Sequence, residues 1–219
     1  MLLDAKGVGG HRHTPHRSEN TAWRAVPAGP EKGIMSATDS EHRRRLAQFT
    51  GRGYDKGRGL PVCALWAFVA EPLQRSVLCP PRLRVALLRA FGATIGSGTL
   101  VRHDVRIHWP WKLTIGDHCW VGVGAWLLNL EDITLGDDVC VSQQAMLCTG
   151  SHRMDDPAFE YDNGPIVIRD GAWIAVRATV LRGVTVGEDA VVGATALAAR
   201  DVPPGGRLGA PRAEVRTAP

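Results

Sequence analysis

The chain has 219 residues and a mass of 23.6 kDa, and its 44% hydrophobic and 22% charged residues exclude a chain that is disordered throughout. No apolar run reaches the roughly 18 residues that a membrane-spanning helix needs, and no apolar h-region marks a signal peptide. The net charge of +4 arises in residues 1–59, which carry +5, whereas the remainder carries −1, so we expect no nucleic-acid-binding body.

Residues 1–45 are rich in Gly, Pro, His, Ser and Arg and show no hydrophobic period, so we expect a disordered basic extension. Met35 precedes a more ordinary sequence and is a candidate for the natural start. The five cysteines form no C-x-x-C pair. An odd count without a signal peptide predicts free thiols and a cytoplasmic protein.

Residues 46–92 are predicted to form a short helical cap. Leucines and valines from Leu60 to Phe91 indicate two helical segments, which Cys79-Pro80-Pro81 separates because proline removes a donor and clashes with the preceding turn. We interpret these segments as a cap on the domain that follows. Peripheral contact with the inner face of a membrane through residues 60–91 is the alternative.

From Ile95 onward the sequence repeats with a period of six. Such a period fits neither an amphipathic helix nor an ordinary strand but is typical of a hexapeptide β-helix. Two-residue skips at Leu113-Thr114 and Ile133-Thr134 predict bulged corners. Residues 93–205 are therefore predicted to form an all-β solenoid of about six triangular coils, and residues 206–219 a C-terminal tail. The repeating aliphatic positions are Ile95, Val101, Ile107, Leu113, Ile115, Val121, Leu127, Ile133, Leu135, Val141, Leu147, Ile168, Ile174, Val180, Val186, Val192 and Ala198.

One loop, residues 150–167, interrupts the repeat, and functional residues concentrate in loops that leave a rigid scaffold. His152 stands at the start of this loop. An imidazole can accept a hydroxyl proton at pH 7, which makes His152 a candidate general base. A lone histidine at a loop entrance is also common in structural roles, so both interpretations stay open on the residue type alone.

Three segments read LRAFGATIG (Leu88–Gly96), WPWKLTIGD (Trp109–Asp117) and LCTGSH (Leu147–His152). With the hexads, they resemble hexapeptide-repeat acyltransferases of the maltose and galactoside acetyltransferase group, in particular those assigned to colanic acid biosynthesis. The resemblance implies a left-handed parallel β-helix with a short helical N-terminal segment. It also implies a homotrimer with active sites between subunits, acetyl-CoA as the donor, and no metal.

The resemblance also carries over site residues. His152 matches the catalytic histidine, which takes the proton from an acceptor hydroxyl. Positions that match contacts to the pantetheine arm of the donor are Ser142, Ala175, Val176, Ala194 and Arg200. Contacts to the acceptor are expected from Asn129, Arg153 and Asp155, although Asn129 reads equally well as a corner residue. The implied reaction is O-acetylation of a sugar hydroxyl on a glycoside, nucleotide sugar or exopolysaccharide precursor.

Three alternatives stay open. The first is that the acceptor group is an amine rather than a hydroxyl, as in N-acetylation of an amino sugar. A second alternative is a metal protein similar to γ-carbonic anhydrases, because His103 and His108 have an H-x₄-H spacing, although a zinc site needs a third ligand. The third is a non-catalytic trimeric scaffold.

Overall fold

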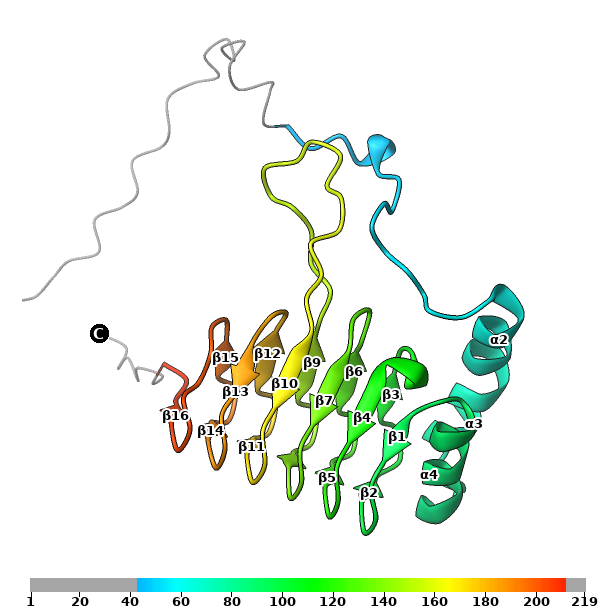
Figure 1. The fold of residues 1–219 in the computed structure, drawn as a ribbon, viewed down its shortest axis with the longest axis vertical. Helices are drawn as coiled ribbons and strands as arrows, with labels where there is room; N and C mark the ends of the chain where they lie inside the picture. Colours follow the sequence, from blue (N-terminus) through cyan, green and yellow to red (C-terminus); the bar gives the residue numbers. More distant parts are fainter. Residues whose placement is uncertain (1–42, 212–219) are drawn as a thin grey trace, which may run out of the picture. The chain divides into compact units, whose positions relative to one another are not determined.

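The structure is a computed structural model that describes residues 43–211 (Figure 1). Most of the expected basic extension, residues 1–45, lies outside these residues, and so does Met35. Residues 212–219 of the expected tail also lie outside them.

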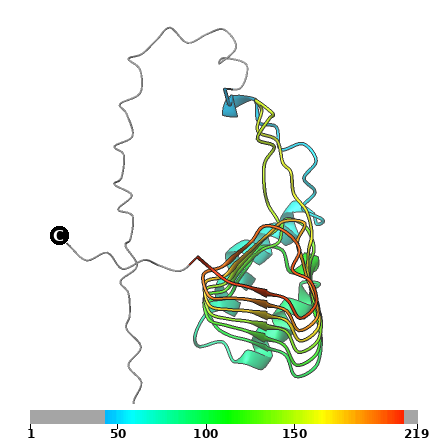
Figure 2. The same cartoon turned by 90° about the vertical axis from the view of Figure 1, so that its left-hand side faces the viewer.

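The body of the chain is a parallel β-solenoid of about six turns, as the hexads predict. Its coils build three parallel sheets, which form the three faces seen along the stack in Figure 2. Sheet A contains β1 (Thr94–Ile95), β4 (Leu113–Ile115), β7 (Ile133–Leu135), β10 (Ile166–Ile168) and β13 (Thr185–Val186). Sheet B contains β2 (Leu100–Val101), β5 (Trp120–Val121), β8 (Cys140–Val141), β11 (Trp173–Ile174), β14 (Val191–Val192) and β16 (Arg207–Leu208). Sheet C contains β3 (Arg106–Ile107), β6 (Trp126–Leu128), β9 (Met146–Cys148), β12 (Thr179–Leu181) and β15 (Leu197–Ala198).

The core of the solenoid consists of the predicted aliphatic residues, all of which are buried. Equivalent residues stack in register: Val121 pairs with Val141, which pairs with Ile174. The small residues four positions later, such as Ala125 and Ala145, are also fully buried, because the corners leave no room for longer side chains. The sequence repeat is therefore a direct record of one packing environment used in every coil.

Three kinds of corner join the sheets, and we call them the AB, BC and CA corners after the sheets that they connect. Each AB and BC corner between successive strands has one residue with a left-handed backbone, such as His118 and Asp138 at AB or Gln144 and Arg177 at BC. The CA corners do not follow this rule. Leu113-Thr114 and Ile133-Thr134, where bulged corners were expected, are ordinary paired strand residues. The extra length lies before them, where Pro110–Lys112 forms a 3-10 helix, η3.

The N-terminal cap contains α2 (Leu60–Leu65), a π-helical turn η2 (Trp66–Ala70), α3 (Glu71–Arg75) and α4 (Pro81–Ala90). Trp66 and Leu88 are buried against the first coil, and Trp66 Nε1 donates to His108 C=O at 3.0 Å. The buried Arg84 guanidinium donates to four backbone carbonyls, among them Val101 at 2.9 Å and Cys79 at 2.7 Å. Arg84 thereby links the two cap segments to the solenoid, and burial lowers its pKa.

The opposite face of the cap is apolar and exposed: Phe68 is 82% and Leu78 88% exposed, and Leu60, Val69 and Val77 are also open to solvent. No helix within residues 43–211 is long and apolar enough to cross a bilayer. At the other end, the coils extend beyond the predicted boundary at residue 205, because β16 pairs with β14.

Candidate active site

The interrupting loop is a two-stranded hairpin, residues 149–164, at the CA corner between β9 and β10. Its two limbs are joined by backbone hydrogen bonds, from Asp162 N–H to Ser151 C=O at 2.9 Å and from Gly164 N–H to Thr149 C=O at 3.0 Å. Thr149 fixes the hairpin where it leaves the solenoid, since its buried hydroxyl donates to Leu128 C=O at 2.8 Å. The hairpin therefore rises from a fixed point of the solenoid (Figure 1).

His152 lies on the first limb, where it forms an antiparallel bridge with Tyr161. Its Nδ1 atom is 2.7 Å from Phe159 C=O. A carbonyl oxygen can only accept, so Nδ1 carries the proton and the neutral ring keeps its lone pair on Nε2. The Phe159 ring stacks on the imidazole at 4.3 Å and fixes its orientation. This arrangement suits a general base whose accepting atom is Nε2.

A cleft of about 550 Å³ opens beside His152. Arg153 and Asp155, two of the expected acceptor contacts, line it together with His152. Asp162 and Arg182 also line it and form an ion pair across the CA corner of the next coil. The sequence reasoning did not single out Arg182, which follows a strand of the regular repeat and carries no motif.

Asn129, the third expected acceptor contact, is not in this cleft. It is fully buried, its Oδ1 accepts from Trp109 N–H at 3.0 Å, and its Nδ2 donates to Trp109 C=O at 2.5 Å and Lys112 C=O at 3.2 Å. All of its polar atoms therefore serve the CA corner of the preceding coil. The structure corrects the expectation of an acceptor contact in favour of the corner interpretation.

A segment that the sequence did not connect with the site runs beside the hairpin. We call residues 43–59 the strap. The strap lacks the helical character expected of residues 46–92, apart from a three-residue 3-10 helix, η1 (Leu46–Gln48). Its Phe49 ring meets the His152 ring edge-on at 5.8 Å, and its Tyr54 ring lies 5.2 Å from Tyr161. Both tyrosines of the chain belong to this cluster.

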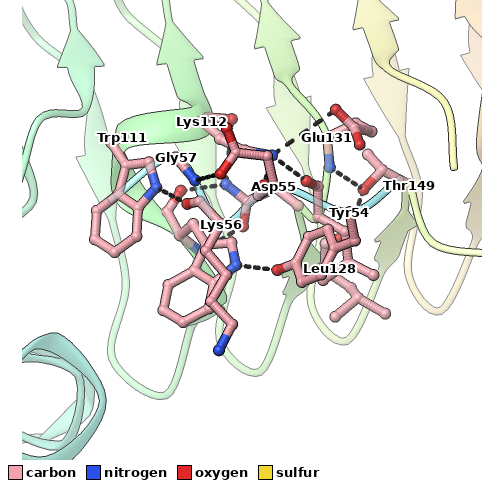
Figure 3. A network of polar contacts seen from close by, with 12 residues as sticks. Tyr54, Asp55, Lys56, Gly57, Trp111, Lys112, Leu128, Glu131 and Thr149 are labelled. Carbon is pink, nitrogen blue, oxygen red and sulfur yellow. Dashed lines mark hydrogen bonds and ion pairs between the residues drawn. The ribbon is translucent and has the colours of Figure 1, made fainter. Parts of the chain in front are cut away.

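The WPWK tract (Trp109–Lys112) binds the C-terminal part of the strap, at residues 54–57 (Figure 3). Trp111 Nε1 donates to Lys56 C=O at 2.5 Å, and Lys112 Nζ donates to Asp55 C=O at 2.6 Å. Trp109 Nε1 donates to the Tyr54 hydroxyl. Every polar side-chain group of the tract is thus bonded to the strap or to a neighbouring corner, which gives this sequence motif a structural purpose.

Comparison with known proteins agrees with this fold. No protein-family model matches the chain. The Escherichia coli protein WcaF, named as an acetyltransferase of colanic acid biosynthesis, is 40% identical over 152 residues, which are 69% of this chain and 84% of WcaF. The chain belongs to the hexapeptide-repeat acetyltransferases. It is therefore an enzyme of the acyltransferase class.

Two further acetyltransferases are similar. The galactoside O-acetyltransferase of Escherichia coli is 24% identical over 127 residues, which are 55% of this chain and 61% of that enzyme. A hexapeptide-repeat acetyltransferase of Vibrio cholerae, solved with acetyl coenzyme A, is 27% identical and superposes with a TM-score of 0.64. That structural match covers 72% of this chain and 87% of the other.

In this acetyltransferase the five expected donor contacts do not lie together. Ser142, Ala175, Val176 and Ala194 stack at the BC corners of successive coils, as the backbone bonds from Ser142 N–H to Ile174 C=O and from Ala175 N–H to Val192 C=O show. Arg200 follows β15 and lies at a CA corner instead. Sheet C separates the BC corners from the CA corners, and so from His152. Within one acetyltransferase chain, four of the five expected donor contacts are therefore on a different edge of the prism from His152, whereas Arg200 is on the same edge.

The metal-site alternative lacks ligands within the described part of this acetyltransferase. Residues 43–211 contain no group of three or more His, Cys, Asp or Glu side chains placed to hold a metal ion. His108 packs against Trp109, with ring centroids 4.3 Å apart. Burial lowers the pKa of His108, and Lys56 and Lys112 lower it further.

Proposed function

We propose that the chain transfers an acetyl group from acetyl-CoA to a sugar hydroxyl of a glycoside, nucleotide sugar or exopolysaccharide precursor, with His152 as the general base. The observation that carries the proposal is the bond between His152 Nδ1 and the Phe159 carbonyl, which leaves Nε2 as the ring nitrogen that can accept a proton. The acetyl-CoA complex of the Vibrio cholerae relative supports the choice of donor. A cytoplasmic location stays a prediction from the sequence.

The proposed reaction balances without further reagents. The acceptor hydroxyl gives its proton to His152 Nε2 while its oxygen attacks the thioester carbonyl carbon. The new C–O ester bond forms, the C–S bond breaks, and the imidazolium returns the proton to the CoA sulfur. Arg153 and Asp155 line the cleft, and we propose that they hold the acceptor, since guanidinium and carboxylate groups form hydrogen bonds with sugar hydroxyls.

An acetyl-CoA turnover assay over free glycosides, nucleotide sugars and polysaccharide repeat units tests this proposal. We expect one class to release free CoA thiol and gain one acetyl group by mass. Mild alkali removes an ester but not an amide, so treatment of the product distinguishes O-acetylation from N-acetylation. An alkali-stable product would move the assignment to an amine acceptor, and no turnover with any class would contradict the proposal.

We also propose that the enzyme is a homotrimer whose sites combine the hairpin of one chain with the BC corners of another. The outward side chains support this, because sheets B and C expose apolar residues, Trp120 at 64%, Trp173 at 48% and Leu197 at 56%, whereas sheet A presents threonines such as Thr94 and Thr114. An apolar outer face on a solenoid marks a contact with another protein surface.

Mixing two inactive variants tests the shared site. A His152→Asn chain keeps the BC corners, and a Val176→Trp chain keeps the hairpin but fills the predicted donor groove, because Val176 is 41% exposed. After the chains are exchanged in equal amounts, about a quarter of the sites combine two intact halves, so activity should recover to about a quarter of wild type. Sites built within one chain would give no recovery. Light scattering should give three times the chain mass.

The exposed apolar face of the cap supports membrane contact as a further part of the proposal. Phe68 and Leu78 are the most exposed apolar side chains on it. Co-sedimentation with anionic vesicles should fall to background for Phe68→Asp with Leu78→Asp, while the wild-type chain pellets. Equal sedimentation of both proteins would contradict membrane contact.

A further inference from the structure

The hairpin that carries His152 has almost no support from its own coil. It rises away from the three sheets, so neither of its faces packs on the solenoid core (Figure 1). A two-stranded hairpin on its own is at best marginally stable in water. A general base must nevertheless be held within a fraction of an ångström of its working position. Something outside the coil must therefore fix the hairpin.

The strap supplies bonds to the outer part of the hairpin. The Glu160 carboxylate accepts hydrogen bonds from Thr50 N–H at 2.8 Å and from the Thr50 hydroxyl at 2.7 Å, both at Oε1. Its Oε2 accepts from Arg52 N–H at 3.0 Å. Arg45 N–H donates to Pro157 C=O at 2.7 Å, close to the turn. The Glu160 carboxylate thus joins the hairpin to a strap residue that is 110 residues away in sequence.

The same contact reaches the base itself. Phe49 stands directly before Thr50, and its ring touches both His152 at 5.8 Å and Tyr161 at 5.2 Å. A shift of the Thr50–Glu160 bonds therefore moves an aromatic ring that packs against the imidazole. On the other side, Phe159 directly precedes Glu160 and provides the carbonyl that holds Nδ1. The Thr50–Glu160 pair is therefore one residue away from a contact with His152 on the strap side, at Phe49, and on the hairpin side, at Phe159.

Charge favours the same docking. The hairpin carries Asp155, Asp156, Glu160 and Asp162, whereas the first residues of the strap are Arg43, Arg44 and Arg45. The Arg44 guanidinium lies over the Phe159 ring, 5.0 Å from its centroid. A basic strap against an acidic hairpin is attracted at a range of about one Debye length, roughly 8–10 Å at physiological salt.

We propose that the strap is a part of the active site that positions the hairpin, with Thr50 and Glu160 as positioning residues for His152. The kinetic side of this inference rests on the proposed acetyl transfer, whereas the structural side does not. Neither residue touches the reacting atoms. Their effect is to hold the Phe159 carbonyl and the Phe49 ring where they orient the imidazole.

Hydrogen exchange in full-length Thr50→Val and Glu160→Gln tests the structural side. Both variants keep the size of the side chain. Thr50→Val removes the hydroxyl that donates to the carboxylate, and Glu160→Gln removes the negative charge and replaces one acceptor oxygen with an NH₂ donor. We expect amide exchange at Arg153, Asp162 and Gly164 to speed up about tenfold, with exchange in the coil strands unchanged. Thr114→Val makes the same change on the exposed face of sheet A and should leave hairpin exchange unaltered. Hairpin amides that exchange at the wild-type rate in both Thr50→Val and Glu160→Gln would overturn the proposal.

Kinetics of the same variants test the positioning role. We expect kcat/KM for the acceptor to fall about tenfold, with KM for acetyl-CoA unchanged, because four of the five expected donor contacts lie at BC corners and the fifth, Arg200, lies outside the hairpin and the strap. The double variant should lose no more than the larger single loss, since both changes break one contact. Losses that multiply, or an equal rise in KM for acetyl-CoA, would overturn it. A wild-type chain without turnover would contradict the proposed function alone, because the exchange result still stands.

Discussion

The AB and CA corners of one solenoid are built in opposite ways. At AB, carboxylates of three successive coils repeat the same contact: Asp117 Oδ1 accepts from Ser97 N–H at 2.5 Å, Asp137 Oδ1 from Asp117 N–H at 2.7 Å, and Asp170 Oδ1 from Asp137 N–H at 3.0 Å. At CA, successive coils carry a 3-10 turn, a buried asparagine, the hairpin and Arg182.

This difference indicates that the AB corners stabilise the fold, whereas the CA corners hold the candidate functional residues. A contact that recurs in each coil adds nearest-neighbour stabilisation along the stack, and a change there affects two coils at once. A corner released from the repeat can hold groups that no other coil needs. His152, the cleft beside it and the strap all meet at CA, so changes at the two corners should affect different measurements.

The largest effect should come from His152→Asn, which removes the base at CA. We expect kcat to fall about 10²- to 10⁴-fold, because asparagine cannot accept the acceptor proton. Thermal unfolding should stay near wild type, since the contacts of His152 are confined to the hairpin and strap. Steady-state rates and melting curves measured on the same samples check both statements.

A matched substitution at AB is the control. His118 has a left-handed backbone, φ 56°, which asparagine tolerates, so His118→Asn makes the same chemical change without strain. We expect its kcat to equal that of wild type. If His152→Asn kept a rate within tenfold of wild type, the assignment of the base would be wrong.

Gly116→Ala at AB should have the opposite effect, a loss of stability without a loss of activity. A Cβ atom there would lie 2.6 Å from the backbone carbon and oxygen of Gly136, which cannot rotate away. Overpacking of this kind should lower the free energy of unfolding by about 3 kcal/mol, with kcat unchanged. Urea unfolding measures the loss. Gly209→Ala, where a Cβ meets nothing within 4 Å, should stay within about 0.5 kcal/mol of wild type.

Asn129→Ala tests a CA residue that serves the fold. It removes the three hydrogen bonds to Trp109 and Lys112 and leaves buried backbone groups unpaired, so we expect a loss of about 2 kcal/mol in the free energy of unfolding. KM for the acceptor should not change. An unchanged unfolding curve with a raised acceptor KM would return Asn129 to the acceptor site.

The sequence predicts what repeats. Every aliphatic position from Ile95 to Ala198 is buried as expected. Each coil packs an aliphatic side chain at the same positions, and this repetition produces the period of six in the sequence. His152 could be selected because it stands where the period fails. Arg153 and Asp155 followed from their place next to it.

The sequence could not predict contacts that occur once. The Thr50–Glu160 pair spans 110 residues and no pattern links its ends, although the basic strap and acidic hairpin carry a charge signal that points to it. The sequence allowed two interpretations of Asn129. An asparagine at a corner can bind the acceptor, or it can stabilise the turn through a left-handed backbone or side-chain hydrogen bonds. Only the observed partners of its amide decide between these interpretations.

The smallest predicted effect is the pH dependence of the strap. The hydrogen bond from the Thr50 hydroxyl, together with those from the backbone of residues 50–52, holds the pKa of Glu160 below its usual value near 4.5. A carboxylate whose pKa is lower in the docked state stabilises docking above its undocked pKa, and this contribution is lost as the pH falls through the lowered value. The strap should therefore stay docked at neutral pH and loosen only below about pH 4.5.

Amide chemical shifts of Thr50 and Arg52 report this titration directly, because both amides donate to the carboxylate. We expect a midpoint below 4.5 in the wild-type chain and a higher midpoint in Thr50→Val, which lacks the hydroxyl donor. The AB corner gives the comparison: backbone donation from Ser97 lowers the pKa of Asp117 in the same way, and Thr50→Val should leave that midpoint unmoved. A wild-type midpoint for Glu160 at or above 4.5 would mean that the strap does not hold the hairpin through this carboxylate.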